Sequence, residues 1–397
     1  MPTLTRSPRD PAFVRDPYPF YDEARAVGPL FLWRDYGFPC AAGYAEVSAL
    51  LRDRRFGREL PQDLRPARPA HLADFYAIDD RSMLDREPPA HTRLRGLVLR
   101  AFTSRRVALL GPEIAALART LANALDPHGC DLISGFAEPL PVIVIARLLG
   151  APEAMAGRFL AWSHAMVAIY QARRDRAVED AANAAAREFT DYLRGLVDQR
   201  RHRPGDDLIT ALIAAEAEGD RLDTAELIAT CVLLLNAGHE ATVHAIGNGV
   251  AAILAAGLDP SALFATPTVT AATIEEILRF DPPLHLFTRY ALEDGEAFGY
   301  RFRRGDTIGC LLAAANRDPA RFEAPHRFDP ARAPVPHLSF GAGIHFCVGA
   351  PLARAELEIA LPILFERMPG LAFAAPPAFA DRYHFRGLNE LRVRAAS

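Results

Sequence analysis

The chain has 397 residues, of which 50% are hydrophobic and 24% charged, and its formal net charge is −4. These proportions are typical of a globular protein with a large core, and they provide no basic field of the kind that nucleic-acid binding requires. No window reaches the roughly 18 continuous apolar residues of a membrane-spanning helix. We therefore expect a cytoplasmic protein, monomeric, with no nucleic-acid or membrane partner.

The cysteines also limit the possible classes of protein. Their number is odd and none forms a C-x-x-C pair, so the sequence indicates neither a disulfide framework nor a cysteine zinc site. This pattern favours a reducing compartment, in which at most one or two cysteines have a special role. The five cysteines are Cys40, Cys130, Cys231, Cys310 and Cys347.

The first part of the chain, to about residue 90, is interrupted by Pro, Gly and Asp, and its short apolar runs predict strands, as at residues 30–33. Beyond it, from about residue 92 to 258, helical patterns dominate. Alanine-rich stretches with the spacing of amphipathic helices occupy residues 112–125, 152–170 and 176–201.

The strongest single helix is predicted to follow Asp223. Asp223 and Glu226 stand three residues apart, in the pattern of a capping box. The helical pattern continues to about Ala256 and ends at Gly257. At 1.5 Å per residue the helix is roughly 50 Å long, enough to cross a whole domain.

The last third of the chain combines helices with short extended segments. A helix is predicted over residues 269–280, extended segments over 288–306, a loop rich in Pro, Arg and Phe over 317–336, and a final helix from about Ala350. Because no repeat, low-complexity tract or linker interrupts the pattern, we predict one mainly α-helical domain with small β-sheets over residues 1–397.

A dense motif lies just before the final helix. Residues 340–349 read F-G-A-G-I-H-F-C-V-G and match F-G-x-G-x-H-x-C-x-G. A lone cysteine in a glycine turn is more often an inert core residue, but the complete motif reverses that interpretation. The segment resembles the haem-binding loop of cytochromes P450, in which the cysteine, here Cys347, is the axial ligand of haem b (iron protoporphyrin IX).

The residue types of this motif suit that resemblance. A thiolate ligand pushes electron density onto haem iron and favours O–O cleavage. Phe340 belongs to the same loop, and Gly341 and Gly349 allow the backbone to approach a flat ring closely. A helix that begins near Ala350 places its positive N-terminal end beside the sulfur of Cys347. The resemblance implies that the haem lies between the long helix and this loop.

A second family motif, E-x-x-R, occurs at Glu276 and Arg279. Side chains three residues apart share a helix face and can pair, although surface pairs of this kind are common. In the family this pair is buried and bound to a third arginine ahead of the haem loop. Arg327 and Arg332 are both candidates for the third position, and we favour Arg327.

The resemblance extends to the residues that hold the haem propionates. His91 and Arg95 belong to an H-T-R-L-R segment and stand four residues apart, so that both side chains reach one ligand. Buried carboxylates need cationic partners. By resemblance, Arg289 and His345 complete this set, although any one arginine taken alone is more often a solvated surface charge.

The middle of the long helix resembles the family's oxygen-binding segment A-G-x-E/D-T. Gly238 and Glu240 match it, and Gly238 leaves room over the haem. The alcohol that should follow the acid is missing, because Ala241 occupies its position. Thr242 lies one residue later, about 100° around the helix, and cannot simply substitute. In the family this alcohol assists proton delivery during oxygen activation, so ordinary tightly coupled hydroxylation is in doubt.

The missing alcohol leaves three hypotheses open: a substrate hydroxyl or ordered water replaces it, the reaction is a coupling or desaturation with other proton needs, or the enzyme is poorly coupled. The substrate pocket is expected to be mainly apolar or aromatic. Asn236 is an exception, since it puts a polar group either into the pocket or into the core. The residues expected in the pocket are Asn236, Ala237, Leu284, Phe287 and Phe385.

The sequence therefore predicts a haem-thiolate monooxygenase that oxidises a small organic molecule of secondary metabolism or catabolism with O2. Electrons must come from a separate donor, and the resemblance implies a ferredoxin and its reductase. The alternatives are a haem-thiolate enzyme of oxidative coupling, desaturation or isomerisation, and a non-catalytic haem or ligand-binding protein.

Overall fold

The computed structural model describes residues 1–170, 174–215 and 220–396. The chain forms two compact units: the first comprises residues 1–64, 115–137 and 241–397, and the second residues 65–114 and 138–240. Each unit is assembled from segments that are far apart in the sequence, and one domain over the whole chain stays a prediction. Within the described ranges, no helix has both the length and the apolar character needed to cross a bilayer.

The first unit contains a six-stranded sheet with the order β1-β2-β3-β9-β6-β4. Its strands are β1 (Thr3–Leu4), β2 (Phe31–Trp33), β3 (Phe38–Ala41), β4 (Phe56–Gly57), β6 (Leu286–Ala291) and β9 (Thr307–Leu311). In the antiparallel pair β6–β9, Phe287 lies opposite Cys310 and Arg289 opposite Ile308. Because side chains alternate along a strand, Phe287 and Arg289 point to the same face of the sheet.

Short strands form the remaining sheets of this unit. They are β5 (Cys130–Asp131), β7 (Gly295–Ala297), β8 (Tyr300–Phe302), β10 (Ala372–Phe373), β11 (Ala378–Phe379), β12 (Leu388–Glu390) and β13 (Arg392–Arg394), in the sheets β10-β13-β5, β11-β12 and β7-β8. Its helices are α1 (Pro11–Arg15), α2 (Tyr18–Ala26), α3 (Tyr44–Arg52), α13 (Pro260–Leu263), α14 (Pro267–Phe280), α15 (Leu312–Ala315) and α16 (Ala350–Arg367).

A buried polar cluster ties both ends of the chain to the end of α14. The Tyr18 hydroxyl donates to Asp281 Oδ1 at 2.6 Å, and Arg386 Nε donates to the same oxygen at 2.8 Å. Burial alone would raise the pKa of Asp281, but the Arg386 charge and the other groups around the carboxylate hold it well below its ordinary value. Asp281 therefore stays ionised and keeps both donors.

The same cluster continues through an imidazole. His285 is 0% exposed, and its Nδ1 lies 2.7 Å from the Tyr21 hydroxyl, which also donates to the Tyr383 hydroxyl at 2.9 Å. These contacts join Tyr21 to residues 264 and 362 positions further along the sequence. We call this cluster the terminal clasp: Tyr18, Tyr21, Asp281, His285, Tyr383 and Arg386.

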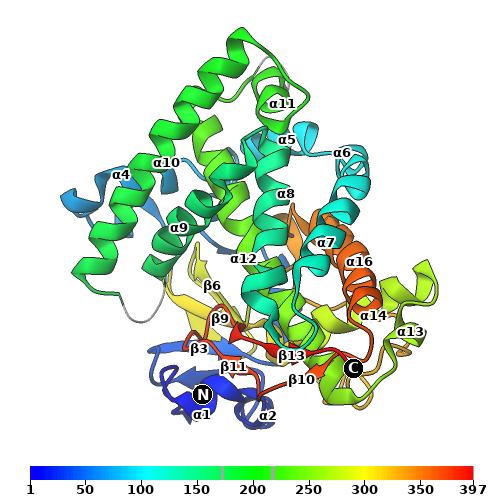
Figure 1. The fold of residues 1–397 in the computed structure, drawn as a ribbon. Helices are drawn as coiled ribbons and strands as arrows, with labels where there is room; N and C mark the ends of the chain where they lie inside the picture. The colour runs from blue at the N-terminus through cyan, green and yellow to red at the C-terminus, as the bar shows by residue number, and fades with distance from the viewer. Residues whose placement is uncertain (171–173, 216–219, 397) are drawn as a thin grey trace. The chain divides into compact units, whose positions relative to one another are not determined.

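The second unit is helical. Its helices are α4 (Ala73–Asp79), α5 (Ala90–Ala101), α6 (Ser104–Leu109), α8 (Pro139–Leu149), α9 (Ala156–Val167), α10 (Arg176–His202) and α11 (Leu208–Ala214). The long helix α10 packs along α9 and α4 (Figure 1). Trp162 on α9 stacks against Phe189 on α10, with ring centroids 5.1 Å apart.

Two helices, α7 (Gly111–Ala124) and α12 (Thr224–Ala256), contribute residues to both units. The start of α12 has the predicted capping box: Glu226 N–H donates to Asp223 Oδ1 at 2.8 Å, and Asp223 N–H donates to Glu226 Oε2 at 3.0 Å. Two otherwise unpaired backbone donors are satisfied in this way. The predicted long helix and its start are confirmed.

The mainly helical architecture with small sheets is also confirmed. The predicted helices correspond to α7, α9, α10, α14 and α16, and the predicted strand at residues 30–33 to β2. The short apolar runs in the first part of the chain predicted strands, and the short helices there were not predicted. Those helices, α1 to α4, are at most nine residues long, too short for a clear periodic signal.

Candidate functional site

The Cys347 loop folds back on itself before α16 begins. Cys347 N–H donates to the carbonyl oxygen of Phe340 at 3.0 Å, which closes the loop. The Cys347 side chain is exposed. Helix α16 begins three residues later at Ala350, with Gly349 as its N-cap. The loop therefore presents a thiol beside the positive end of an 18-residue helix, which favours the thiolate form.

Two glycines give this loop its shape. Gly341 and Gly343 have φ values of +69° and +71°, a left-handed conformation that residues with a Cβ rarely adopt. A Cβ at Gly343 would also collide with the carbonyl oxygen of Leu51. A Cβ at Gly341 would lie 3.9 Å from the ring of Phe287. The loop thus lies close to α3 and to one face of β6.

Two charged residues that were not predicted from the sequence, Arg354 and Glu275, lie near the loop. Arg354 on α16 lies 4.6 Å from the ring centroid of Phe340 and is bound to Glu275 at 2.6 and 3.0 Å. The hydrogen bonds to Glu275, and more weakly the charge of Cys347, raise the pKa of Arg354. The guanidinium of Arg354 is therefore close enough to stabilise a Cys347 thiolate.

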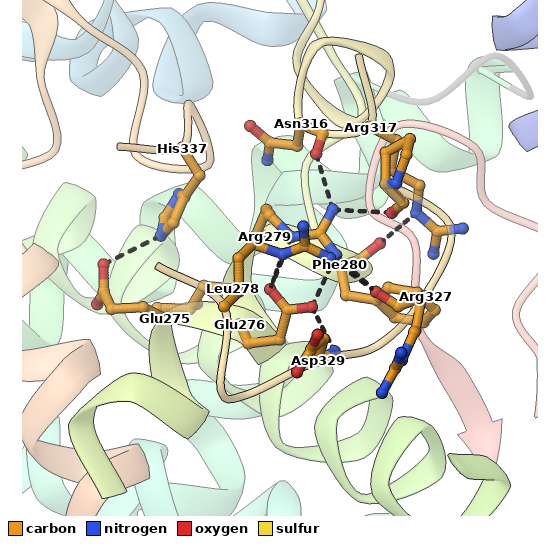
Figure 2. A network of polar contacts seen from close by, with 12 residues as sticks. Glu275, Glu276, Leu278, Arg279, Phe280, Asn316, Arg317, Arg327, Asp329 and His337 are labelled. Carbon is orange, nitrogen blue, oxygen red and sulfur yellow. Dashed lines mark hydrogen bonds and ion pairs between the residues drawn. The ribbon is translucent and has the colours of Figure 1, made fainter. Parts of the chain in front are cut away.

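Glu275 also contacts a histidine. His337 Nε2 lies 3.3 Å from Glu275 Oε2, a contact drawn in Figure 2. Burial alone would raise the pKa of Glu275, but the contacts with His337 and Arg354 lower it to about 2. The carboxylate of Glu275 therefore stays charged at neutral pH and fixes Arg354 near the loop.

The predicted E-x-x-R pair lies on α14 and is buried, and Figure 2 shows its polar contacts. Arg279 donates to both carboxylate oxygens of Glu276, at 2.7 and 2.8 Å, and the two side chains are 2% and 3% exposed. Arg279 also donates to the carbonyl oxygens of Asn316 and Pro325, at 2.9 and 3.0 Å. A surface interpretation of this pair is therefore excluded.

The contacts of this pair lead directly to the haem-loop motif. Asn316, whose carbonyl accepts from Arg279, binds Leu338 N–H through Oδ1 at 2.7 Å and donates to Ser339 Oγ at 2.8 Å. Ser339 Oγ in turn donates to the Leu278 carbonyl at 2.6 Å. Ser339 directly precedes Phe340, so these hydrogen bonds anchor the start of the Cys347 loop to α14.

The third arginine of this network is Arg332. Its Nε lies 3.5 Å from Glu276 Oε2, and its side chain is 12% exposed. Arg327 contributes only its carbonyl oxygen, which accepts from Arg279 at 3.2 Å. This corrects the prediction that favoured Arg327. The reason is geometric: the loop turns so that the backbone of Arg327, and not its side chain, faces α14.

The other predicted residues of the first unit lie around the same loop and strand. Arg289 is 1% exposed, shares a face of β6 with Phe287, and donates to the Thr288 carbonyl at 2.9 Å. An isolated β-bridge joins Leu284 to Phe385, so two expected pocket residues are neighbours. His345 closes the short 3-10 turn Gly343–His345 within the loop.

The remaining predicted residues belong to the second unit. His91 is 3% exposed on α5, where Arg95 lies one turn further on and is half-buried. Asn236, Ala237, Gly238 and Glu240 are on α12. Ala237 is exposed, and Glu240 is 2% exposed. Their assignment to propionates, oxygen and substrate stays a prediction.

Ala241 and Thr242 fall on the part of α12 that belongs to the first unit. Thr242 is 3% exposed and lies next to the carboxyl group of Glu356 on α16, which is 1% exposed. Burial raises the pKa of Glu356 to about 8, although the neighbouring Thr242 hydroxyl lowers it. Glu356 is therefore a neutral acid at pH 7 and holds a proton beside the hydroxyl that follows Ala241.

The sequence analysis missed Glu356, although one signal was available. Glu356 lies on the buried, apolar face of the last helix, together with Leu352, Leu357 and Ala360. An acid in such a stripe is expected either to be paired or to keep its proton. Glu356 is more than a hundred positions away from Ala241 in the chain, so no local pattern links the two residues.

The neutral state of Glu356 predicts a pH-dependent stability. The unfolded chain releases this proton near the ordinary pKa of 4.5, whereas the folded protein keeps it to about pH 8. Stability from this group is therefore complete below pH 4.5 and falls as the pH rises to about 8, by about 1 kcal/mol per unit. We expect Glu356→Gln to remove this slope, measured by urea unfolding across that range.

Glu366→Gln is the matched control, because Glu366 is exposed on the same helix. It should leave the slope unchanged. If Glu356→Gln and the parent protein lose stability in parallel across this pH range, Glu356 is ionised in the folded state and the account of its buried proton is wrong.

Comparisons with known proteins agree with this geometry. The family model for cytochrome P450 matches residues 264–368, which include the E-x-x-R pair and the Cys347 loop. Cytochrome P450 monooxygenase PikC from Streptomyces venezuelae is 39% identical over 395 residues, covering 96% of this chain and 92% of PikC.

Two solved structures extend the likeness to the fold. P450BioI, crystallised with acyl carrier protein ligated to hexadec-9Z-enoic acid, has a TM-score of 0.90 and 34% identity, and the match covers 97% of this chain and 99% of P450BioI. Myxobacterial CYP267B1 in complex with myristic acid has a TM-score of 0.88 and 38% identity, with 98% of each chain covered. The chain therefore belongs to the cytochrome P450 family and is a bacterial P450 monooxygenase, an oxidoreductase with a haem-thiolate cofactor.

Proposed function

We propose that this monooxygenase hydroxylates a mainly apolar, acyl-chain-like molecule, free or carried on a partner protein, with O2 and with electrons from a ferredoxin and its reductase. Two relatives support the substrate class, since their structures contain myristic acid and an acyl carrier protein ligated to a hexadecenoic acid. The expected pocket residues Leu284, Phe287 and Phe385 are apolar, as such a substrate requires. We place the reaction in the cytoplasm, which suits five cysteines that form no disulfide.

The observation that carries this proposal is the exposed Cys347 thiol in front of α16. Three of the other cysteines are buried, and burial raises their pKa: Cys231 to about 12, Cys310 to about 11, and Cys40 well above its ordinary value. They are inert thiols. Cys347 differs from them in exposure, in its helix terminus and in the nearby Arg354 guanidinium, and these are the features of a metal-binding thiolate.

The residues present fit a haem. Cys347 would bind the iron, and the left-handed glycines of its loop keep the backbone narrow enough for a flat ring. Arg289 and His345 are proposed as partners of the propionates. When bound, a thiolate-ligated haem supplies oxygen activation. The protein supplies the axial ligand, the binding site and the protons.

Proton supply is where this chain departs from its family. We propose that the Glu356 carboxyl holds a proton and that the Thr242 hydroxyl accepts it and passes it on, assisted by an ordered water or a substrate hydroxyl at the position that Ala241 leaves open. Glu356 and Thr242 are both buried, so the proton is protected from bulk solvent. Gly238 and Glu240 keep the proposed roles of oxygen-site residues.

We expect Ala241→Thr to raise the product formed per NADH, by up to about tenfold, because a positioned proton donor contributes at least that much. Thr242→Val should lower it by a similar factor, since the relay from Glu356 is cut. The measurement is product and NADH consumption under identical electron supply. Unchanged yields in both variants would mean that proton delivery does not limit this enzyme.

Ala241 also supports a second candidate, a P450 reaction of oxidative coupling, desaturation or isomerisation. The two candidates differ in whether an oxygen atom enters the product. Turnover of an acyl-chain panel under ¹⁸O₂, with a ferredoxin and its reductase, followed by mass analysis, separates them. Incorporation of one labelled oxygen supports hydroxylation, and unlabelled oxidised product supports the second candidate.

A further inference from the structure

On neighbouring turns of α9 and α12, three residues each have a buried polar atom that lacks a hydrogen-bond partner among the described residues. The atoms are Ser163 Oγ, Asn236 Oδ1 and His239 Nε2. Ser163 and His239 are both 0% exposed. An unsatisfied buried polar atom costs about 1–3 kcal/mol, and native proteins contain few of them. Three within one helix pair therefore need an explanation.

The contacts between the two helices place these three residues on neighbouring turns. Asn236 Nδ2 lies 3.7 Å from Met166 Sδ, and the rings of His164 and His239 have centroids 6.0 Å apart. Residue numbers rise along α9 as they fall along α12, so the helices run antiparallel here. Ser163 is then level with His239, which lies about one helical turn, roughly 5 Å along the axis of α12, from Asn236.

The free atoms share one chemical character. His239 Nδ1 lies 2.9 Å from the Leu235 carbonyl and therefore carries the proton, which leaves Nε2 as an acceptor. Burial lowers the pKa of His239 to about 4, so the ring is neutral. Asn236 Nδ2 faces Met166, which leaves Oδ1 as a second acceptor. The Ser163 hydroxyl both donates and accepts. The missing partner is therefore a hydrogen-bond donor.

We propose that Ser163, Asn236 and His239 form a subsite for a hydroxyl group of the substrate, distant from the carbon that is oxidised. The subsite rests on the proposed function, since it selects hydroxylated acyl chains among the possible substrates. A neutral hydroxyl suits it better than an ammonium group, because none of the three side chains carries a compensating charge.

Met166 closes the subsite in the present structure. Its thioether occupies the space next to the Asn236 amide, and a methionine side chain has three rotatable bonds that let it adopt another position at little cost. A substrate hydroxyl that displaces the sulfur exchanges a weak contact for hydrogen bonds to Asn236 and His239. This exchange is the source of the selectivity.

The test uses tetradecanoic acid and its monohydroxylated isomers, with the hydroxyl at successive carbons. Each is titrated into the haem-containing protein, and dissociation constants are taken from the shift of the haem absorbance. One isomer should bind about tenfold more tightly than the parent acid, which corresponds to about one net hydrogen bond. Asn236→Leu, Ser163→Ala and His239→Leu should each reduce this preference, and Met166→Ala should increase it.

Thr230→Val is the matched control, because Thr230 is a buried polar residue of the same helix and the same unit. It should leave the preference intact. The subsite is refuted if no isomer binds more tightly than tetradecanoic acid, or if the three variants keep the preference and only raise the midpoint of thermal unfolding. A retained preference without oxygenated product would instead refute the proposed function and leave the subsite standing.

Discussion

Cys347→Ala is expected to abolish the absorbance maximum at about 450 nm that the reduced, carbon-monoxide-treated protein shows when a thiolate binds the haem. The thiol of Cys347 is the exposed one that precedes a helix N-terminus and lies near an arginine, so no buried cysteine can replace it without moving the backbone. Monooxygenase turnover should disappear with the spectral signal. Visible spectroscopy and haem content per chain are the measurements.

Cys130→Ser provides the control, since Cys130 is a half-buried thiol on β5. The absorbance of this variant should equal that of the parent. Unaltered haem binding and an unaltered spectrum in Cys347→Ala would show that the axial ligand is another residue, and the assignment of the whole loop would fail with it.

Glu276→Gln is expected to destabilise the fold by about 3–5 kcal/mol, because it leaves the buried Arg279 charge without its carboxylate. Glu276 also accepts from Asp329 N–H at 2.7 Å and lies 3.5 Å from Arg332. Two arginines thus lose their counterion at once, and a single amide oxygen remains as acceptor for Arg279 and Asp329 N–H. Urea unfolding and the yield of haem-loaded protein measure the effect, and the yield should fall because the start of the Cys347 loop is no longer anchored.

The neighbouring Glu275→Gln is a stringent control, since it changes the same residue type one position away. Its side chain is 44% exposed, so the cost should stay within about 1 kcal/mol. If both variants lose the same stability, the buried pair has no special structural role. Arg279→Lys should not rescue the network, because lysine cannot form the paired contacts of a guanidinium.

Local signals in the sequence predicted much of this structure. The capping box of Asp223 and Glu226 marks the start of α12, and the glycines ahead of Cys347 adopt the left-handed conformations that glycine alone tolerates well. In both cases the residues that determine the geometry are adjacent in the chain. The cysteine loop and the E-x-x-R pair were found for the same reason.

What the sequence could not predict depends on contacts between distant segments. The choice between Arg327 and Arg332 follows from a loop in which Ala324 adopts a φ of 41°, a conformation unusual for alanine. Likewise, Glu356 becomes important only because α16 packs so that its carboxyl meets Thr242. The pairing of Glu275 with Arg354 is likewise formed between two different helices.

The terminal clasp has a consequence for biosynthesis. Tyr18 and Tyr21 leave the ribosome early, yet their hydrogen-bond partners include Asp281, His285 and Tyr383. A nascent chain that ends before Asp281 therefore exposes α2 with both phenol groups unpaired, and the clasp stays incomplete until Tyr383 and Arg386 have been made. The N-terminal helices of the first unit thus wait for their polar partners during the synthesis of more than 250 intervening residues.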